Sequence, residues 1–164
     1  MTYETNELGG WIVPDGTTLP PGAVVPSYSY IGDYCTIGNG CTIGNSCRIG
    51  NYCTIGYSCT IGNGCRIGYG CSIGNDGTIG NRCIIGYGCT WLGVQVSKWL
   101  TLANVDGSGR QLKVVVAVDG SVKVEAGCFV GTADEFCDRA KDEGKGTYVA
   151  VVRAVVQALT TSEE

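Results

Sequence analysis

Between Val13 and Ile85 every sixth residue is aliphatic, and this period limits the possible folds more than any other feature of the chain. The positions that keep the register are Val13, Leu19, Val25, Ile31, Ile37, Ile43, Ile49, Ile55, Ile61, Ile67, Ile73, Ile79 and Ile85, and Trp91 occupies the next place. A period of six suits neither an amphipathic helix nor an array of hairpins. It suits a short strand followed by a corner, in which alternate strand residues point inward.

The typical hexad, Cys-Thr-Ile-Gly-Asn-Gly, predicts which side chains are buried. Ile and the Cys two residues before it share the inside, while the Thr between them points outward. The cysteines that follow this rule are Cys35, Cys41, Cys47, Cys53, Cys59, Cys65, Cys71, Cys83 and Cys89, and Gly77 occupies the skipped place. Asn-Gly and Tyr-Gly pairs supply corner residues that tolerate left-handed backbone angles. Three such hexads would close one triangular coil.

We expect these cysteines to be packed, reduced thiols that act as small hydrophobic side chains. The chain has no Cys-x2-Cys pair, and consecutive cysteines would enter the core from different faces of the coil, which does not suit a metal site. Vertical neighbours such as Cys35, Cys53 and Cys71 are close enough for disulfides to be conceivable. Parallel side chains in register, however, rarely reach the torsion that a disulfide requires.

The repeat resembles that of the bacterial transferase hexapeptide superfamily, and the resemblance covers about half of the chain. It implies a left-handed parallel β-helix of about 4.5 coils over residues 11–93. Members of this superfamily usually form trimers and are often acyltransferases. The first three hexads carry Trp11, Thr17 and Ala23 in place of Cys, and we expect them to form the starting coil or its cap.

Eighteen residues per coil would sort the outward side chains into three columns, with neighbours about 4.8 Å apart. Two columns are polar but uncharged: Thr18, Thr36, Thr54, Ser72 and Thr90 in one, and Val24, Thr42, Thr60 and Thr78 in the other. The third contains Ile12, Tyr30, Arg48, Arg66 and Ile84, with Arg82 at one bordering corner and Tyr34, Tyr52, Tyr69 and Tyr87 at the other. This third face has the character of a binding surface.

We therefore predict a ligand site made by Arg48, Arg66, Arg82, Tyr52, Tyr69 and Tyr87. Stacked arginines repel each other, so an anion or a carboxylate would stabilise the column, and the tyrosines would offer stacking surfaces. Two other interpretations remain open. The arginines are solvated surface residues in the first, and in the second they pair with acidic groups of the C-terminal segment in a subunit interface.

The chain contains no histidine. Hexapeptide acyltransferases use a histidine as general base, and related β-helical carbonic anhydrases bind zinc through histidines, so neither chemistry is expected here. The remaining candidates for catalysis are Asp33, Asp76 and Cys128, all of them poor, because their unperturbed pKa values lie well away from neutral pH. We expect no enzyme activity, no metal and no cofactor.

A second module is predicted over residues 94–164, because the hexad register stops after Gly93; residues 1–10 would form an N-terminal arm. Alternation predicts a three-stranded meander over 97–105, 111–118 and 122–126. Thr132 and Glu135 form a capping box that opens a helix, and Gly144 can close it. A second helix over 148–159 has Val on most sides and is expected to be largely buried. The fold class is thus mainly β, with a small α+β module.

The stretch from Ala126 to Phe136 is similar to one that follows hexapeptide repeats in small phage and prophage proteins, which implies a phage origin. The formal net charge of −4 argues against bulk nucleic-acid binding. No apolar run is long enough to span a membrane, and we expect a cytoplasmic protein. The predicted function is non-catalytic: a homotrimer that sequesters a small anionic or nucleotide-like ligand or inhibits a host protein. The alternatives are a structural virion or assembly component and an acyltransferase-like enzyme.

Overall fold

A computed structural model describes residues 2–161, so the outermost residues of the predicted arm and module, 1 and 162–164, lie outside it. The chain divides into two compact units, Met1–Trp91 and Leu92–Glu164, which we call the repeat unit and the C-terminal module. This boundary lies two residues before the position at which the hexad register was expected to end. No helix among the described residues is long and apolar enough to cross a membrane.

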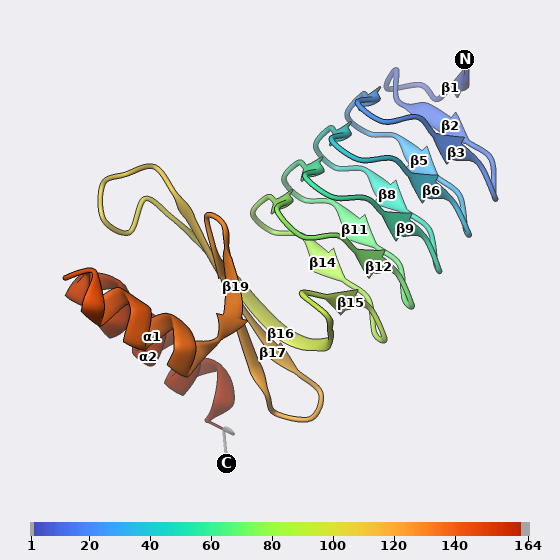
Figure 1. Cartoon of the computed structure of the whole chain (residues 1–164). Coiled ribbons are helices and arrows are strands. Elements are labelled where there is room, and N and C mark those ends of the chain that lie inside the picture. Colours follow the sequence, from blue (N-terminus) through green and yellow to red (C-terminus); the bar gives the residue numbers. More distant parts are fainter. Residues whose placement is uncertain (1, 162–164) are drawn as a thin grey trace. The chain divides into compact units, whose positions relative to one another are not determined.

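The repeat unit is a parallel, left-handed β-helix with three short strands per coil (Figure 1). Its strands are β2 (Trp11–Val13), β3 (Thr18–Leu19), β4 (Val24–Val25), β5 (Tyr30–Ile31), β6 (Thr36–Ile37), β7 (Thr42–Ile43), β8 (Arg48–Ile49), β9 (Thr54–Ile55), β10 (Thr60–Ile61), β11 (Arg66–Ile67), β12 (Ser72–Ile73), β13 (Thr78–Ile79), β14 (Ile84–Ile85) and β15 (Thr90–Trp91). Every third strand pairs in register, so the three faces are β2-β5-β8-β11-β14, β3-β6-β9-β12-β15 and β4-β7-β10-β13. At the N-terminus β1 (Glu4–Thr5) pairs antiparallel with β2 and extends the first face.

The predicted orientation of the hexad is confirmed, because the Ile of each typical strand is buried and the residue before it is exposed. Cysteine has a second role that the period alone did not predict. Each repeat thiol donates a hydrogen bond to a corner carbonyl of the coil before it, as from Cys53 Sγ to Gly32 O at 3.2 Å. At the skipped place, Gly77 and Trp91 face the same interior space. The missing thiol therefore leaves room for the indole ring.

The corners are aligned by side chains that reach from one coil to the next. Asp33 N–H donates to Asp15 Oδ1 at 2.8 Å, Asn51 N–H to Asp33 Oδ1 at 2.7 Å, and Tyr69 N–H to Asn51 Oδ1 at 3.1 Å. The glycine before each such residue lies against the previous coil: a Cβ on Gly50 would stand 2.4 Å from Asp33 Oδ1. Glycine at this place is thus required by the close approach of the coils.

The C-terminal module is an antiparallel sheet with two helices. Its strands are β16 (Val94–Ala103), β17 (Gln111–Ala117), β18 (Val122–Ala126) and β19 (Phe129–Thr132), and its helices are α1 (Ala133–Asp142) and α2 (Gly146–Thr160). The predicted three-stranded meander lacked β19, which pairs with β18 across a tight turn at Gly127 and Cys128. The predicted capping box is present, because Glu135 N–H donates to Thr132 Oγ1 and Thr132 N–H donates to Glu135 Oε2.

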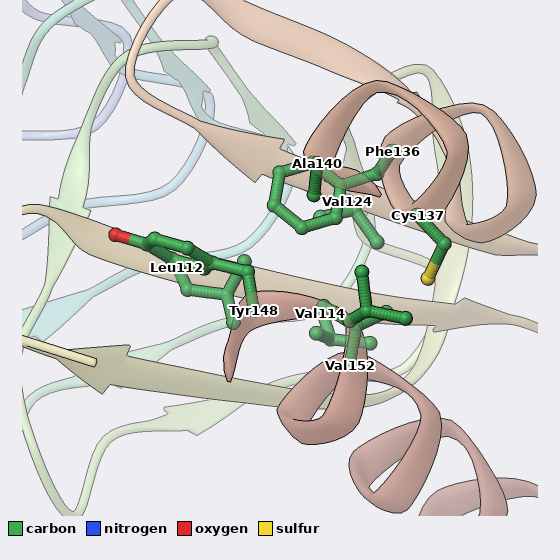
Figure 2. Close-up of a cluster of buried hydrophobic side chains, with 9 residues drawn as sticks. Leu112, Val114, Val124, Phe136, Cys137, Ala140, Tyr148 and Val152 are labelled. Atoms are coloured by element: carbon green, nitrogen blue, oxygen red, sulfur yellow. The ribbon is translucent and has the colours of Figure 1, made fainter. Parts of the chain in front are cut away.

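The core of the module lies between one face of the sheet and the two helices (Figure 2). It contains Leu112, Val114 and Val124 from the sheet, Phe136, Cys137 and Ala140 from α1, and Tyr148, Val149 and Val152 from α2. The expectation that α2 is largely buried is wrong for the single chain. Arg153, Ala154 and Gln157 are exposed, because only one side of the helix contacts the core. A cross-strand ion pair between Lys113 and Glu125 is also buried.

Candidate binding face

The predicted arginine column is present on the first face of the repeat unit. Arg48 on β8 and Arg66 on β11 are directly paired in the parallel register, with Tyr30 before them and Ile84 after them. Both arginines are exposed, because they precede the inward Ile of their strands. Strand pairing places their backbones about 4.8 Å apart, so one anion can reach both guanidinium groups.

The tyrosines gather at the corner that follows this face. Tyr34 and Tyr52 adopt positive φ values of 57° and 55°, and their rings stack with centroids 5.3 Å apart. Tyr69 meets Tyr52 edge to face at 5.6 Å. Gly70 makes this contact possible, because a Cβ there would stand 2.6 Å from the Tyr52 ring. Tyr87 lies at the same corner one coil further on and is the most exposed of the four, at 81 %.

Arg82 lies at the opposite border of the same face, at the corner that precedes β14. Its φ is +58°, and the residue before it is held by the coil below, since Asn81 N–H donates to Asn63 Oδ1 at 2.8 Å. The structure thus places all six predicted residues around one face: two arginines on it, one arginine at one border and three tyrosines at the other. We call this set the arginine face.

The charge on the arginine face is not neutralised by an ion pair within the part of the chain that the structure describes. None of Arg48, Arg66 and Arg82 forms an ion pair with any residue between 2 and 161. The corner that carries the tyrosines also holds the carboxylates of Asp15 and Asp33, and each accepts a backbone N–H of the next coil. A face with adjacent, unpaired cations and flanking aromatic rings can bind an anion that carries a flat group.

The two acids considered for catalysis do not come together. Asp33 and Asp76 lie at different corners of the β-helix, and Asp76 has a positive φ of 58°. Cys128 is exposed on the β18–β19 turn of the other unit. Across residues 2–161 no group of three or more histidine, cysteine or acidic side chains has the arrangement of a metal site.

The repeat thiols are poor nucleophiles for a physical reason. Burial raises the pKa of Cys35 and Cys59, and hydrogen bonding with Cys53, followed by Cys89, raises that of Cys71. Hydrogen bonding with Cys65 lowers the pKa of Cys47 to about 7, and hydrogen bonding with Cys71 lowers that of Cys89 to about 7. Both of these thiols are buried, so neither can reach a substrate outside the core.

Sequence reasoning missed one group of polar residues in the C-terminal module. Arg110, Arg139, Glu143, Lys145 and Tyr148 line a pocket of about 170 Å³, together with Cys128 and Phe129. These residues come from a loop, two helices and a turn, and no period connects them. The one sequence signal that could have helped was the Gly127-Cys128 pair, which is typical of a hairpin turn and would have placed Cys128 between two paired strands.

Comparison with known families identifies the repeat. Residues 12–45 and 40–75 match the family model described as "Bacterial transferase hexapeptide (six repeats)". No curated protein and no solved structure matches the chain. The matched segments begin with three hexads that have Val or Leu inward and Pro at the corner, and continue through coils whose inward Ile and corner Gly follow the hexad. The repeat unit is therefore a hexapeptide-repeat β-helix.

Proposed function

We propose that this protein is a non-catalytic binding protein that holds an anionic, nucleotide-like ligand on its arginine face. The observation that carries the proposal is the direct pairing of Arg48 with Arg66, without an acidic partner among residues 2–161. Like charges on directly neighbouring strand positions destabilise a sheet. A phosphate or carboxylate between the two guanidinium groups replaces this repulsion by charge-assisted hydrogen bonds.

The tyrosine corner supports a ligand with a flat group beside its charge. The rings of Tyr34, Tyr52 and Tyr69 are in contact, yet Tyr52 and Tyr69 remain about half exposed, at 51 % and 52 %. Aromatic side chains that are packed on one side and open on the other are suitable platforms for a base. A nucleotide combines a stacking base with phosphates.

The non-catalytic part of the proposal is supported by the lack of histidine in the chain and by the positions of Asp33 and Asp76 at different corners of the β-helix. A homotrimer is part of the same proposal. The other two faces carry uncharged columns of Thr, which favour packing against a neighbouring subunit, and trimers are frequent among hexapeptide-repeat proteins. The short likeness of residues 126–136 to phage proteins supports a phage origin, with a host metabolite or a host protein as the target.

The test is calorimetric titration with ATP, tripolyphosphate and adenosine, with the molar mass measured by light scattering. We expect a trimer that binds ATP more tightly than tripolyphosphate and binds adenosine weakly. Arg48→Gln and Arg66→Gln should each weaken ATP binding by about tenfold or more. Tyr52→Ala should weaken ATP but leave tripolyphosphate unchanged.

Tyr57→Ala is the matched control, because Tyr57 is 60 % exposed and lies at a corner away from the arginine face. It should leave every affinity unchanged. If no anion binds, or if Arg48→Gln and Arg66→Gln bind ATP as the parent protein does, the arginine face is a solvated surface and the proposal is wrong.

A further inference from the structure

The pocket in the C-terminal module has the features of a second, separate ligand site. It is bordered by Arg110 before β17, by Cys128 on the β18–β19 turn, and by side chains of α1 and α2. Phe129 and Phe136, whose ring centroids lie 5.4 Å apart, supply an apolar wall. Its volume of about 170 Å³ is small. Cavities of about 150 Å³ are known to hold one benzene molecule, so the pocket fits a single ring.

A buried hydroxyl group in this pocket lacks a partner. Tyr148 is only 4 % exposed, and its hydroxyl oxygen makes no hydrogen bond with any described residue. Figure 2 shows its ring beside Leu112, with the hydroxyl pointing away from the aliphatic side chains of the core. Leaving a buried hydroxyl without a hydrogen-bond partner destabilises the folded state. Tyrosine at this place is therefore unfavourable for stability unless another molecule supplies an acceptor or donor.

The Tyr148 hydroxyl influences the nearby acid Asp106, but no carboxylate among the described residues lies within hydrogen-bond geometry of that hydroxyl. The Asp106 carboxylate accepts the N–H of Ser108 at 3.0 Å, and hydrogen bonds with Ser108 are the main reason that its pKa is lowered. The Tyr148 hydroxyl makes only a lesser contribution to that shift. Asp106 is fully accessible to water and lies in the turn between β16 and β17.

The lining of the pocket carries more positive than negative charge. Glu143 is its acidic residue, and it is shared by two cations: Arg139 Nε lies 3.0 Å from Oε1 and Lys145 Nζ lies 2.6 Å from Oε2. These contacts lower the pKa of Glu143 to about 2. The third cation, Arg110, forms no ion pair with any residue between 2 and 161. An acid group of a ligand would supply the negative charge that Arg110 lacks.

We propose that this pocket binds a single-ring aromatic acid. The ring packs on Phe129 and Phe136, and the acid group binds Arg110 and gives the Tyr148 hydroxyl its hydrogen-bond partner. The ligand class follows from three independent features: the size of the pocket, its aromatic wall, and two unsatisfied polar groups that favour an anion.

Cys128 provides a built-in probe for the test. It is an exposed thiol that lines the pocket, whereas the other cysteines are buried or, for Cys83, half-buried. Alkylation of the native protein with iodoacetamide, followed by peptide mass spectrometry, therefore reports on Cys128. We expect benzoate to slow this alkylation several-fold at saturation, with weaker protection by benzyl alcohol, which lacks the charge, and by acetate, which lacks the ring.

Two variants examine the polar groups. Arg110→Gln should weaken benzoate binding by about tenfold or more, because a charge-assisted hydrogen bond is lost. Tyr148→Phe should also weaken it, while the thermal stability of the ligand-free protein stays equal or rises. If Tyr148 had only a structural role, Tyr148→Phe would not lower the affinity for benzoate while keeping or raising thermal stability. Arg153→Gln, at an exposed arginine of α2 outside the pocket, is the control and should bind benzoate normally.

The proposal is wrong if benzoate at millimolar concentration gives no protection of Cys128, or if Arg110→Gln and Tyr148→Phe are protected as well as the parent protein. A loss of stability in Tyr148→Phe would show that the hydroxyl has a partner within the folded chain. That result would overturn the argument from the unsatisfied group. The outcome does not depend on whether the arginine face binds nucleotides.

Discussion

The repeat unit and the C-terminal module build their interiors in different ways. In the repeat unit the same contacts recur every eighteen residues. An Ile packs inward, a cysteine thiol donates to a backbone carbonyl, and the side-chain oxygen of a corner Asn or Asp accepts a backbone N–H of the next coil. In the module each contact is made once. Leu112, Phe136 and Tyr148 meet from a strand and two helices that are distant in the sequence.

This difference determines how far the effect of a destabilising substitution should extend. A repeated unit is stabilised by nearest neighbours, so a local defect weakens the coils beside it. A single core depends on all of its members, so one defect should weaken the whole module. Four predictions test this comparison, from the largest expected effect to the smallest.

Leu112→Ala should destabilise the module by about 2–5 kcal/mol, because Leu112 is completely buried in its core. Denaturant unfolding should be followed by two probes: the thiol reactivity of Cys137 for the module and that of Cys65 for the repeat unit. We expect Cys137 to become reactive at lower denaturant while Cys65 is unchanged. A shift of both thiols together would show that the two units unfold as one. Leu100→Ala, at a partly exposed leucine of β16, should cost at most about 1 kcal/mol.

Gly50→Ala should destabilise the repeat unit by about 3 kcal/mol, since overpacking against backbone cannot relax easily. Its Cβ would meet Asp33 Oδ1 at 2.4 Å and the Gly32 carbonyl carbon at 2.6 Å. Gly146 in α2 has no atom within 4 Å of such a Cβ, so Gly146→Ala should cause no loss. Equal effects of the two changes in thermal unfolding would refute the close-approach explanation.

Cys65→Ala should cost about 1–2 kcal/mol, because it removes a buried thiol and the hydrogen bond to Gly44 O at 3.2 Å. Chemical unfolding monitored by circular dichroism measures the change. Cys128→Ala, at the exposed thiol of the module, should stay within about 0.5 kcal/mol of the parent protein. A neutral Cys65→Ala would mean that the thiol is only a space filler.

Alkaline pH should weaken the repeat unit before the module. Burial raises the pKa of Cys35 and Cys59 above the usual 9.0, so these groups favour the folded state below that pH and oppose it as the pH rises further. The lowered pKa of Cys47 and Cys89, about 7, has the opposite effect: it stabilises the folded state as the pH rises from about 7 to about 9, so the comparison has to start above that range. Unfolding by denaturant at about pH 10 and about pH 11 should show the loss in Cys65 exposure first. Earlier exposure of Cys137 would contradict this order.

The sequence predicted the repeat unit closely because every role is tied to a place in the hexad. Once Ile49 and Ile67 are placed inward, Arg48 and Arg66 must point outward and pair, and Tyr52 and Tyr69 must share a corner. The edge-to-face contact of those two rings was not predictable, because it depends on the space above Gly70. The donor role of the thiols was also missed, since a period indicates burial but not a hydrogen-bond partner.

In the module, local signals predicted elements but not their assembly. The capping box at Thr132 and Glu135 was found because both partners lie within one turn. Strand β19 was missed because its four residues lie between a two-residue turn and the capping box, too short a stretch to show an alternating pattern. The pocket was out of reach for a stronger reason: Arg110 and Tyr148 become neighbours only through packing between the loop and α2, which leaves no pattern in the chain.

The exact return of the same contacts every eighteen residues makes the β-helix a scaffold of adjustable length. Duplicating one coil would add a step to all three corners at once, and neither end would have to change. Because Arg48 and Arg66 lie on consecutive steps, such a duplication could also lengthen the row of positive charge by one. A change in the number of coils could then adapt the length of the positively charged row to an extended anion, and no new kind of side chain would be required.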